Sequence, residues 1–127
     1  NVRPIEMQAA AGIEQLKKID GFILARRENA DEWKNICFKR GWWSQEEPAT
    51  GKSSWFAFAI IEDGIEQIRK ELDDKGIEYR PIVAGNFTRS RSIKQYTAEF
   101  GDLPNADRVH DNGLYIGNFH KRAAFNL

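Results

Sequence analysis

The sequence has very little of several features that would assign it to a specialised class of protein. Its 127 residues include one cysteine, so no disulfide can form within the chain, and the cysteine and two histidines do not have the spacing of a zinc site. The 19 lysines and arginines balance 19 aspartates and glutamates, which argues against a dedicated nucleic-acid-binding protein. No apolar run approaches the ~20 residues that a membrane-spanning helix needs, and no signal peptide is visible. These absences favour a cytoplasmic protein without metal, nucleic-acid or membrane partners.

What the chain does contain is the composition of a folded domain. It is 41% hydrophobic, 12% aromatic and 30% charged, which argues against disorder. A domain of this length buries roughly two-thirds of the surface of its unfolded chain, enough for a true core. No internal repeat, linker or low-complexity tract divides the sequence, so we predict one domain over residues 1–127. The chain begins at Asn1 rather than at a methionine, and we expect it to be a fragment of a longer polypeptide.

Helical periodicity dominates the first forty residues. Apolar side chains spaced by four, four and three residues predict a first helix with one apolar stripe, formed by Ile5, Ala9, Ile13 and Leu16. Asp20-Gly21 interrupts the pattern, and a second helix is predicted over residues 22–38. Its core-facing side chains are predicted to be Leu24, Trp33 and Ile36.

The middle of the chain has the pattern of a strand, a helix and a second strand. Residues 55–61 form a nearly unbroken apolar run, which is typical of a strand covered on both faces. Asp63 followed by Glu66 has the form of a capping box, and Gly76 is a natural end for the helix that it would start. Residues 77–83 predict a second strand, which Pro81 places at a sheet edge or strand end because it lacks a backbone donor.

The remaining elements are predicted to be short. An edge strand near Trp42-Trp43, helical turns over 92–100 and 104–110, and a last strand over 114–116 complete the chain. The fold class is therefore α/β, in the sense of a two-layer α+β domain whose small antiparallel or mixed sheet is backed by helices on one side.

Few side chains have the pattern of a catalytic group. His110 is predicted at a helix end beside Asp111, as a surface or capping residue. His120 follows a strand end and a turn, where ligand-facing residues often lie, but sequence shows neither the partner nor the pocket that a general base needs. Cys37 lies among apolar residues and is predicted to be a buried structural thiol. Phosphate-loop and hydrolase-elbow motifs are absent from the sequence.

Arg80 is the side chain with two open interpretations. Held by Pro81, its forked donors could bind a carboxylate, a phosphate or a sugar hydroxyl. It could equally form a surface ion pair with Glu78, two residues earlier on the same strand face. Arg89 and Arg91 are predicted to be solvated. Trp42, Trp43 and Trp55, which could stack on a base or a sugar ring, are predicted to pack in the core or cover a sheet edge.

Several longer strings resemble a known family. Residues 1–10 (NVRPIEMQAA) and 12–17 (GIEQLK) resemble the segment that follows the large domain in DegT/DnrJ/StrS-type sugar aminotransferases. A narrower branch, the nucleotide-sugar 3-dehydrases that act on CDP- or GDP-linked 4-keto-6-deoxyhexoses in lipopolysaccharide sugar synthesis, is resembled by four strings. They are residues 53–58 (SSWFAF), 76–88 (GIEYRPIVAGNFT), 101–107 (GDLPNAD) and 112–118 (NGLYIGN).

The resemblance implies the C-terminal small domain of a fold-type I enzyme that uses pyridoxal phosphate (PLP) or pyridoxamine phosphate (PMP). Members hold the cofactor mainly with the large domain, and the residue beneath the cofactor precedes the matched segment. Because the cofactor carries the electron-sink chemistry, we expect this chain alone to bind no cofactor and to be inactive. We therefore assign it no catalytic residue and expect the large cofactor-binding domain to be absent from it.

The resemblance also implies roles for two residues at the start of the chain. Asn1 matches an asparagine that reaches across a dimer interface to the partner's cofactor phosphate. Arg3 lies on the same entry segment, toward the substrate phosphates. The implied complete enzyme is a homodimer that binds a nucleotide sugar.

Four further residues match the sugar-facing edge of the family. Glu78, Arg80 and Asn86 lie in the loop region where an acid and a forked cation orient hydroxyls and a phosphate. His120 matches a histidine after the Gly-Asn turn, although Phe119 stands where the family usually has the first of two histidines. The tail after His120 also departs from the family, whose closing helix is missing or short here.

Two functions are therefore predicted from the sequence. The first is part of a PLP- or PMP-dependent nucleotide-sugar 3-dehydrase or aminotransferase, contributing the sugar-facing and cross-subunit part of the site. The alternative is a stand-alone, non-catalytic domain that acts in assembly or in nucleotide-sugar binding. In either case an apolar patch of Phe38, Trp42 and Trp43 is the predicted surface for association.

Overall fold

The computed structural model describes residues 5–123 and 125. Its helices are α1 (Glu6–Leu16), α2 (Ile19–Arg40), α3 (Ile65–Asp74) and α4 (Pro104–Asn112), and its strands are β1 (Trp43–Ser44), β2 (Ala57–Ile61), β3 (Tyr79–Pro81) and β4 (Gly113–Gly117). Two short 3₁₀ turns, η1 (Phe87–Arg89) and η2 (Arg91–Gln95), precede α4. The segment predicted as a helix over 92–100 is therefore only a 3₁₀ turn, whereas the helix predicted over 104–110 is α4.

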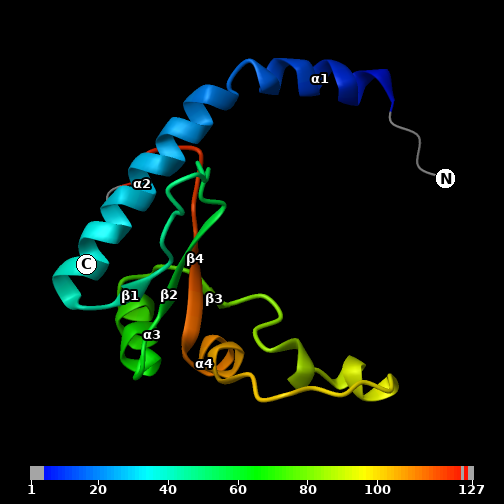
Figure 1. Cartoon of the computed structure of the whole chain (residues 1–127). Coiled ribbons are helices and arrows are strands. Elements are labelled where there is room, and N and C mark those ends of the chain that lie inside the picture. The colour runs from blue at the N-terminus through cyan, green and yellow to red at the C-terminus, as the bar shows by residue number, and fades with distance from the viewer. Residues whose placement is uncertain (1–4, 124, 126–127) are drawn as a thin grey trace.

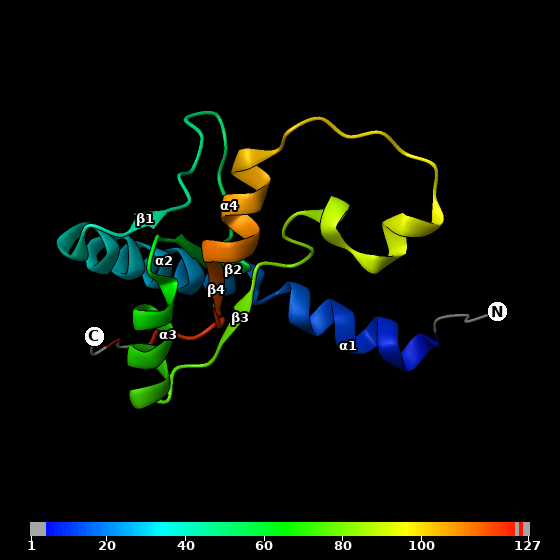
Figure 2. The same cartoon turned by 90° about the horizontal axis from the view of Figure 1, so that it is seen from below.

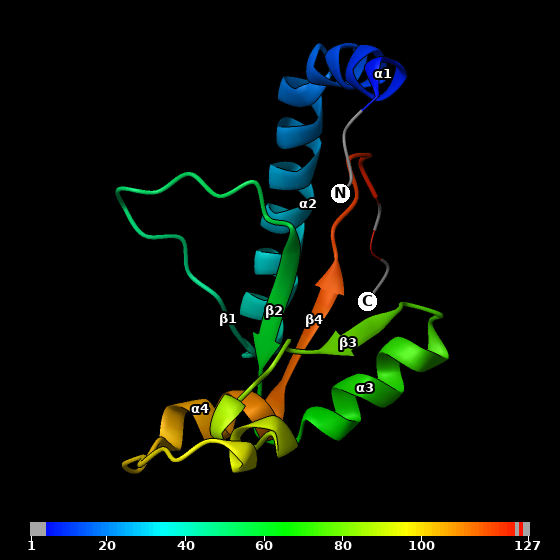
Figure 3. The ribbon, with the colours of Figure 1, turned by 90° about the vertical axis from the view of Figure 1, so that its right-hand side faces the viewer.

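The four strands form one antiparallel sheet in the order β1-β2-β4-β3 (Figure 3). β4 pairs with both β2 and β3, so β2 and β3 run parallel to each other with α3 connecting them. This is a split β-α-β unit, and it confirms the strand–helix–strand pattern predicted for residues 55–83. β3 lies at the sheet edge, as Pro81 predicted.

Helices α2 and α3 cover one face of the sheet and form the core with it (Figure 1). In the register of β2 and β4, Phe58 lies opposite Ile116 and Ile60 opposite Leu114, so these four side chains share that face. The core-facing residues of the two helices are Ala30, Trp33 and Cys37 from α2 and Ile65, Ile68 and Leu72 from α3. The two-layer α/β prediction is confirmed.

The described residues leave the opposite face of the sheet open. Ala57, Ala59 and Tyr115 alternate with the core residues and point to this side, where they are only half-buried. The described residues therefore cover only one face of the 55–61 run, and the prediction that both faces are covered is wrong for this part of the chain. In Figures 1 and 2, α1 and the 82–103 segment extend toward the same side as the open face.

Two local predictions at helix starts are also corrected. α2 begins at Ile19, so Asp20 and Gly21 lie in its first turn and the break falls at Lys17–Lys18 instead. The N-cap of α3 is Gly64, with φ of +88°, and not Asp63. The carboxylate of Asp63 accepts hydrogen bonds from Arg108 and Asn112 instead, because α4 places these donors beside it.

The apolar stripe predicted for the first helix is present but uncovered. α1 has no buried residue, and its apolar side chains are exposed along with Leu24 of α2, which is 60% exposed and so does not face the core. In the predicted association patch, Phe38 is 87% exposed and Trp43 is also exposed, whereas Trp42 is half-buried beneath the Arg40 guanidinium.

Candidate functional site

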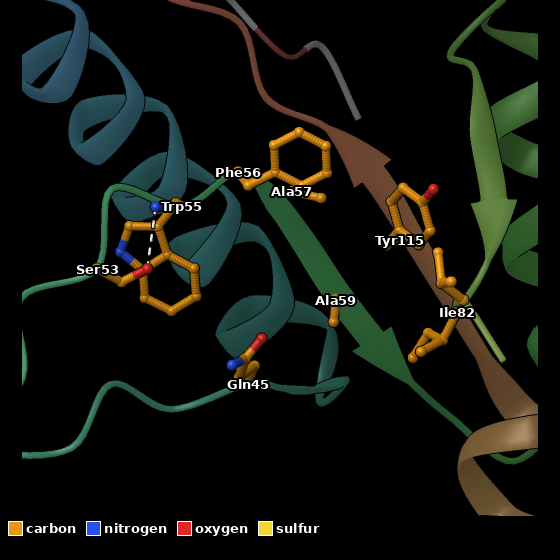
Figure 4. Close-up of a pocket in the computed structure, with 9 residues that line it drawn as sticks. Gln45, Ser53, Trp55, Phe56, Ala57, Ala59, Ile82 and Tyr115 are labelled. Carbon is orange, nitrogen blue, oxygen red and sulfur yellow. Dashed lines mark hydrogen bonds between the residues drawn. The ribbon is translucent and has the colours of Figure 1, made fainter. Parts of the chain in front are cut away.

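A cavity of about 350 Å³ lies on the open face of the sheet (Figure 4). Its floor is the pair of small side chains Ala57 and Ala59, and its apolar walls come from Tyr115 of β4 and from Ile82 and Val83, which follow β3. The remaining lining residues are Gln45, Ser53, Trp55 and Phe56. Small residues at alternate positions of β2 leave this space, which we call the open-face cavity.

The polar wall of the open-face cavity is held by a salt bridge to α2. The two guanidinium nitrogens of Arg27 donate to the two carboxylate oxygens of Glu47, each over 2.9 Å, and Arg27 also donates to the Ser53 carbonyl. The backbone N–H of Ser53 donates back to Glu47. These hydrogen bonds, chiefly that from Arg27, lower the pKa of Glu47, and the same contact raises the pKa of Arg27. The clamp fixes the loop that carries Gln45 and Ser53.

A second cavity, of about 540 Å³, lies between β3, β4 and the C-terminal tail, and Glu78 and Arg80 line it. Their side chains form an ion pair with 2.7 Å between Oε1 and Nη2, and both are exposed. Tyr79, between them, points the other way and donates to Asp73. Burial, together with this carboxylate, raises the pKa of Tyr79. The structure thus contains the ion pair of the sequence analysis, and it presents the guanidinium at a cavity.

Asn86 lines a third cavity, of about 530 Å³, but its side-chain amide is engaged within the protein. It is 4% exposed, and its Nδ2 donates to Asp107 while its Oδ1 accepts from the N–H and the hydroxyl of Thr88. Its backbone N–H donates to Nδ1 of His110 over 3.2 Å. Asn86 therefore holds its loop against α4, whereas the resemblance implied that it faces the sugar.

Arg89 is also bound to α4, which corrects the prediction that it is merely solvated. Its guanidinium contacts both carboxylate oxygens of Asp111 at 2.9 and 2.8 Å and reaches Asp107 at 3.4 Å. Hydrogen bonding to Arg89 lowers the pKa of Asp111 and raises the pKa of Arg89. Arg91 is exposed, as predicted.

The other predicted site residues lie apart from these groups. The His120 ring packs against Phe22 of α2, with 4.6 Å between ring centroids. Asn1 and Arg3 lie outside the described residues. The two structural predictions for buried aromatic and thiol groups are confirmed, since Trp55 and Cys37 are both in the core.

Sequence reasoning missed Tyr115, Phe56, Gln45 and Ser53 as cavity residues. Tyr115 alternates with the buried Leu114 and Ile116, so strand periodicity contained the signal that it faces the other side. The described residues contain no group of acidic, histidine and cysteine side chains that could hold a metal ion. No helix in the same part of the chain is both long and apolar enough to cross a membrane.

Comparisons with known proteins place this architecture in a family. The model of the DegT/DnrJ/EryC1/StrS aminotransferase family matches residues 1–123. GDP-4-keto-6-deoxy-D-mannose 3-dehydratase of Escherichia coli O55:H7 is 41% identical over 125 residues, which are 93% of this chain and 32% of that protein. A lipopolysaccharide biosynthesis protein of Salmonella typhimurium is 31% identical over 92% of this chain and 29% of its own length.

A solved structure agrees with these sequence matches. The E. coli GDP-4-keto-6-deoxy-D-mannose 3-dehydratase with bound hydrated PLP has a TM-score of 0.81 and 39% identity, covering 96% of this chain and 33% of that one. The chain thus spans about a third of the length of these relatives. With the family model matching nearly its full length, this chain belongs to the DegT/DnrJ/EryC1/StrS aminotransferase family.

Proposed function

We propose that this chain is the C-terminal small domain of a cytoplasmic, homodimeric, PLP- or PMP-dependent GDP-sugar 3-dehydratase of deoxysugar and lipopolysaccharide biosynthesis. The observation that carries the proposal is the similarity to GDP-4-keto-6-deoxy-D-mannose 3-dehydratases, which extends over more than nine-tenths of the chain at about 40% identity. An aminotransferase of the same family would be built on the same domain.

The described residues do not by themselves fit the cofactor. A phosphate group needs cations or several free N–H donors. The open-face cavity is lined by no charged side chain, and the third cavity, which Asn86 lines, carries Asp102, Asp107 and Asp111 against Arg89 alone. Arg80 in the second cavity is already paired with Glu78. No lysine is among the described residues that line these three cavities. Cofactor binding is therefore assigned to the rest of the enzyme.

What this chain offers is a substrate-facing surface. The exposed Arg80 guanidinium can exchange Glu78 for a phosphate or a sugar hydroxyl, because both partners are solvated and the surface ion pair is weak. Glu78 can then accept from a second hydroxyl. The open-face cavity, lined mainly by apolar and aromatic groups, suits the contact with the remaining part of the enzyme that covers this side of the sheet.

A chimera tests the proposal. The matching third of the E. coli dehydratase is replaced by this chain, and both PLP absorbance and turnover of GDP-4-keto-6-deoxy-D-mannose are measured. We expect the chimera to retain PLP and to turn over. Arg80→Ala should raise KM about tenfold or more, as for a lost charge-assisted hydrogen bond, while the matched control Arg108→Ala, in an exposed ion pair on α4, should not.

The outcomes separate the two functions predicted from the sequence. A folded chimera that retains PLP but has no turnover would contradict the catalytic role of this domain. An R80A chimera with unchanged KM would contradict the assignment of Arg80 to the substrate. A chain that binds GDP-sugar alone, with no turnover in the chimera, would favour the non-catalytic alternative.

A further inference from the structure

The segment from Ile82 to Arg89 passes from the sheet edge to α4 with an unusual backbone. Ala84 and Gly85 both have positive φ, at +64° and +47°, and Ala84 is one of two described non-glycine residues in that region. L side chains adopt this conformation rarely, so surrounding contacts must hold it. Ile82 and Val83, immediately before it, form a wall of the open-face cavity.

Those contacts come from one face of α4. Asp107, His110 and Asp111 are spaced by three and four residues, so their side chains lie together. Each binds the segment: Asp107 accepts from the Asn86 amide over 2.8 Å, His110 accepts from the Asn86 backbone over 3.2 Å, and Asp111 pairs with Arg89.

His110 is the closest of the three to the left-handed turn. A Cβ added at Gly85 would lie 2.6 Å from Nδ1 of His110 and 3.0 Å from its Cα. Only a glycine lets the backbone come so near to the imidazole. Because Nδ1 accepts the Asn86 N–H, the proton of the neutral imidazole is on Nε2. The turn is thus built around an unprotonated ring nitrogen.

We propose that His110 is a positioning residue, whose Nδ1 acceptor holds the 82–89 segment on α4 and so fixes the Ile82–Val83 wall of the open-face cavity. Nδ1 accepts from a backbone N–H, which gives a histidine a structural role at a helix position that otherwise has the character of an ordinary surface site. The hydrogen bond acts on the segment that joins β3, with Arg80, to α4. An effect of His110 on substrate binding rests on the proposed function, whereas its effect on the position of the 82–89 segment does not.

Amide hydrogen exchange of the 127-residue chain, measured residue by residue by NMR, tests the positioning. In His110→Ala we expect the backbone N–H of Asn86 to exchange at least about fivefold faster, because the hydrogen bond that it donates to Nδ1 is lost. His110→Asn should restore the wild-type rate, since the asparagine Oδ1 takes a position close to that of Nδ1. Arg108→Ala, on the neighbouring face of α4, should leave the Asn86 rate unchanged.

Helix propensity cannot produce this pattern. Alanine is a better helix former than histidine, whereas asparagine is similar to it, so a purely helical effect would make H110A the more protected variant. An Asn86 amide that exchanges equally in wild type and H110A, or an H110N variant that exchanges like H110A, would overturn the proposal.

The chimera with the E. coli dehydratase tests whether His110 affects substrate binding. There we expect H110A to raise KM for GDP-4-keto-6-deoxy-D-mannose several-fold with little change in kcat, and H110N to restore it. An inactive parent chimera would count against the proposed function alone, because the exchange experiment does not depend on it. An active chimera in which H110A leaves KM unchanged would overturn the link between the segment and the substrate.

Discussion

The buried Asn29–Asn118 pair offers the sharpest test of how this fold is held together. Asn29 of α2 is 1% exposed, and its Nδ2 donates to Asn118 Oδ1 at 3.1 Å and to the Lys121 carbonyl at 2.9 Å. Its Oδ1 accepts from the Ala123 N–H at 2.9 Å. Asn118 in turn donates to the carbonyls of Arg26 and Trp55. One amide pair therefore ties the C-terminal tail to α2 and to the start of β2.

Replacing Asn29 by leucine keeps the number and branching of its side-chain heavy atoms and removes all the hydrogen bonds of its amide, of which those to Asn118, Lys121 and Ala123 are the three shortest. At a net ~1 kcal/mol for each, with the partner groups left buried, we expect the free energy of unfolding to fall by about 3 kcal/mol. That is a large part of the ~5–15 kcal/mol typical of a domain. Urea unfolding followed by tryptophan fluorescence measures the change, since Trp33 and Trp55 are both buried. Asn35→Leu, at an exposed position of the same helix, is the matched control.

Asn29→Asp refines the test because it changes only donors into acceptors. A carboxylate there would face Asn118 Oδ1 and the Lys121 carbonyl, both of which are acceptors. Burial among acceptors raises the pKa of the introduced group in the folded state. A protonated carboxyl has one donor where the amide has two, so part of the deficit in stability is present at every pH. The charge-dependent part is absent below the unfolded pKa of ~3.9, grows as pH rises above it and is complete once pH exceeds the folded value. N29L within about 0.5 kcal/mol of wild type, or N29D as stable as N35D at pH 7, would refute this reasoning.

Three other predictions concern single groups. Burial raises the pKa of Cys37 to about 11, so iodoacetamide at neutral pH should label it only as fast as the chain unfolds, and rapid labelling without urea would contradict its burial. Gly85→Ala combines a left-handed φ with a Cβ against His110, and we expect it to cost about 2 kcal/mol in urea unfolding, whereas Gly101→Ala, with open space around it, should be neutral. The hydrogen bond from Arg27 holds the pKa of Glu47 below its ordinary value, so the folded state binds the proton less tightly than the unfolded chain does. The ionised Glu47 therefore contributes stability above its unfolded pKa, and this contribution is lost as pH falls through the folded pKa. Glu47→Gln should be less stable than wild type at neutral pH and equally stable in acid, as measured by urea unfolding.

Elements whose signal is local could be predicted from the sequence. The apolar period of α3, the strand at β4 and the breakers around α4 lie within a few residues of the structure that they specify. The edge position of β3 followed from the missing donor of Pro81. The errors fall where a distant partner decides: Asp63 looks like an N-cap in sequence, yet α4 supplies two donors that compete for its carboxylate.

The candidate site was predictable to a smaller extent for the same reason. Glu78 and Arg80 are two residues apart, so their pairing was visible in the sequence. The contacts that hold Asn86 and Arg89 come from Asp107 and Asp111, about twenty residues later in the chain. Nothing local distinguishes a solvated arginine from one that meets a helix face only after the sheet has formed.

The apolar run at β2 is the error that says most about function. Its alternate residues Ala57 and Ala59 are apolar although nothing among the described residues covers them, and the sequence pattern is that of a strand covered on both faces. A strand that had evolved to face water on one side would alternate apolar and polar residues, because an antiparallel sheet with a solvated face does so. The relatives are three times as long as this chain. The unbroken apolar run therefore predicts a second covering layer that the described residues lack. Such a layer is expected if the proposed remainder of the enzyme lies on the open face, with the open-face cavity at the contact.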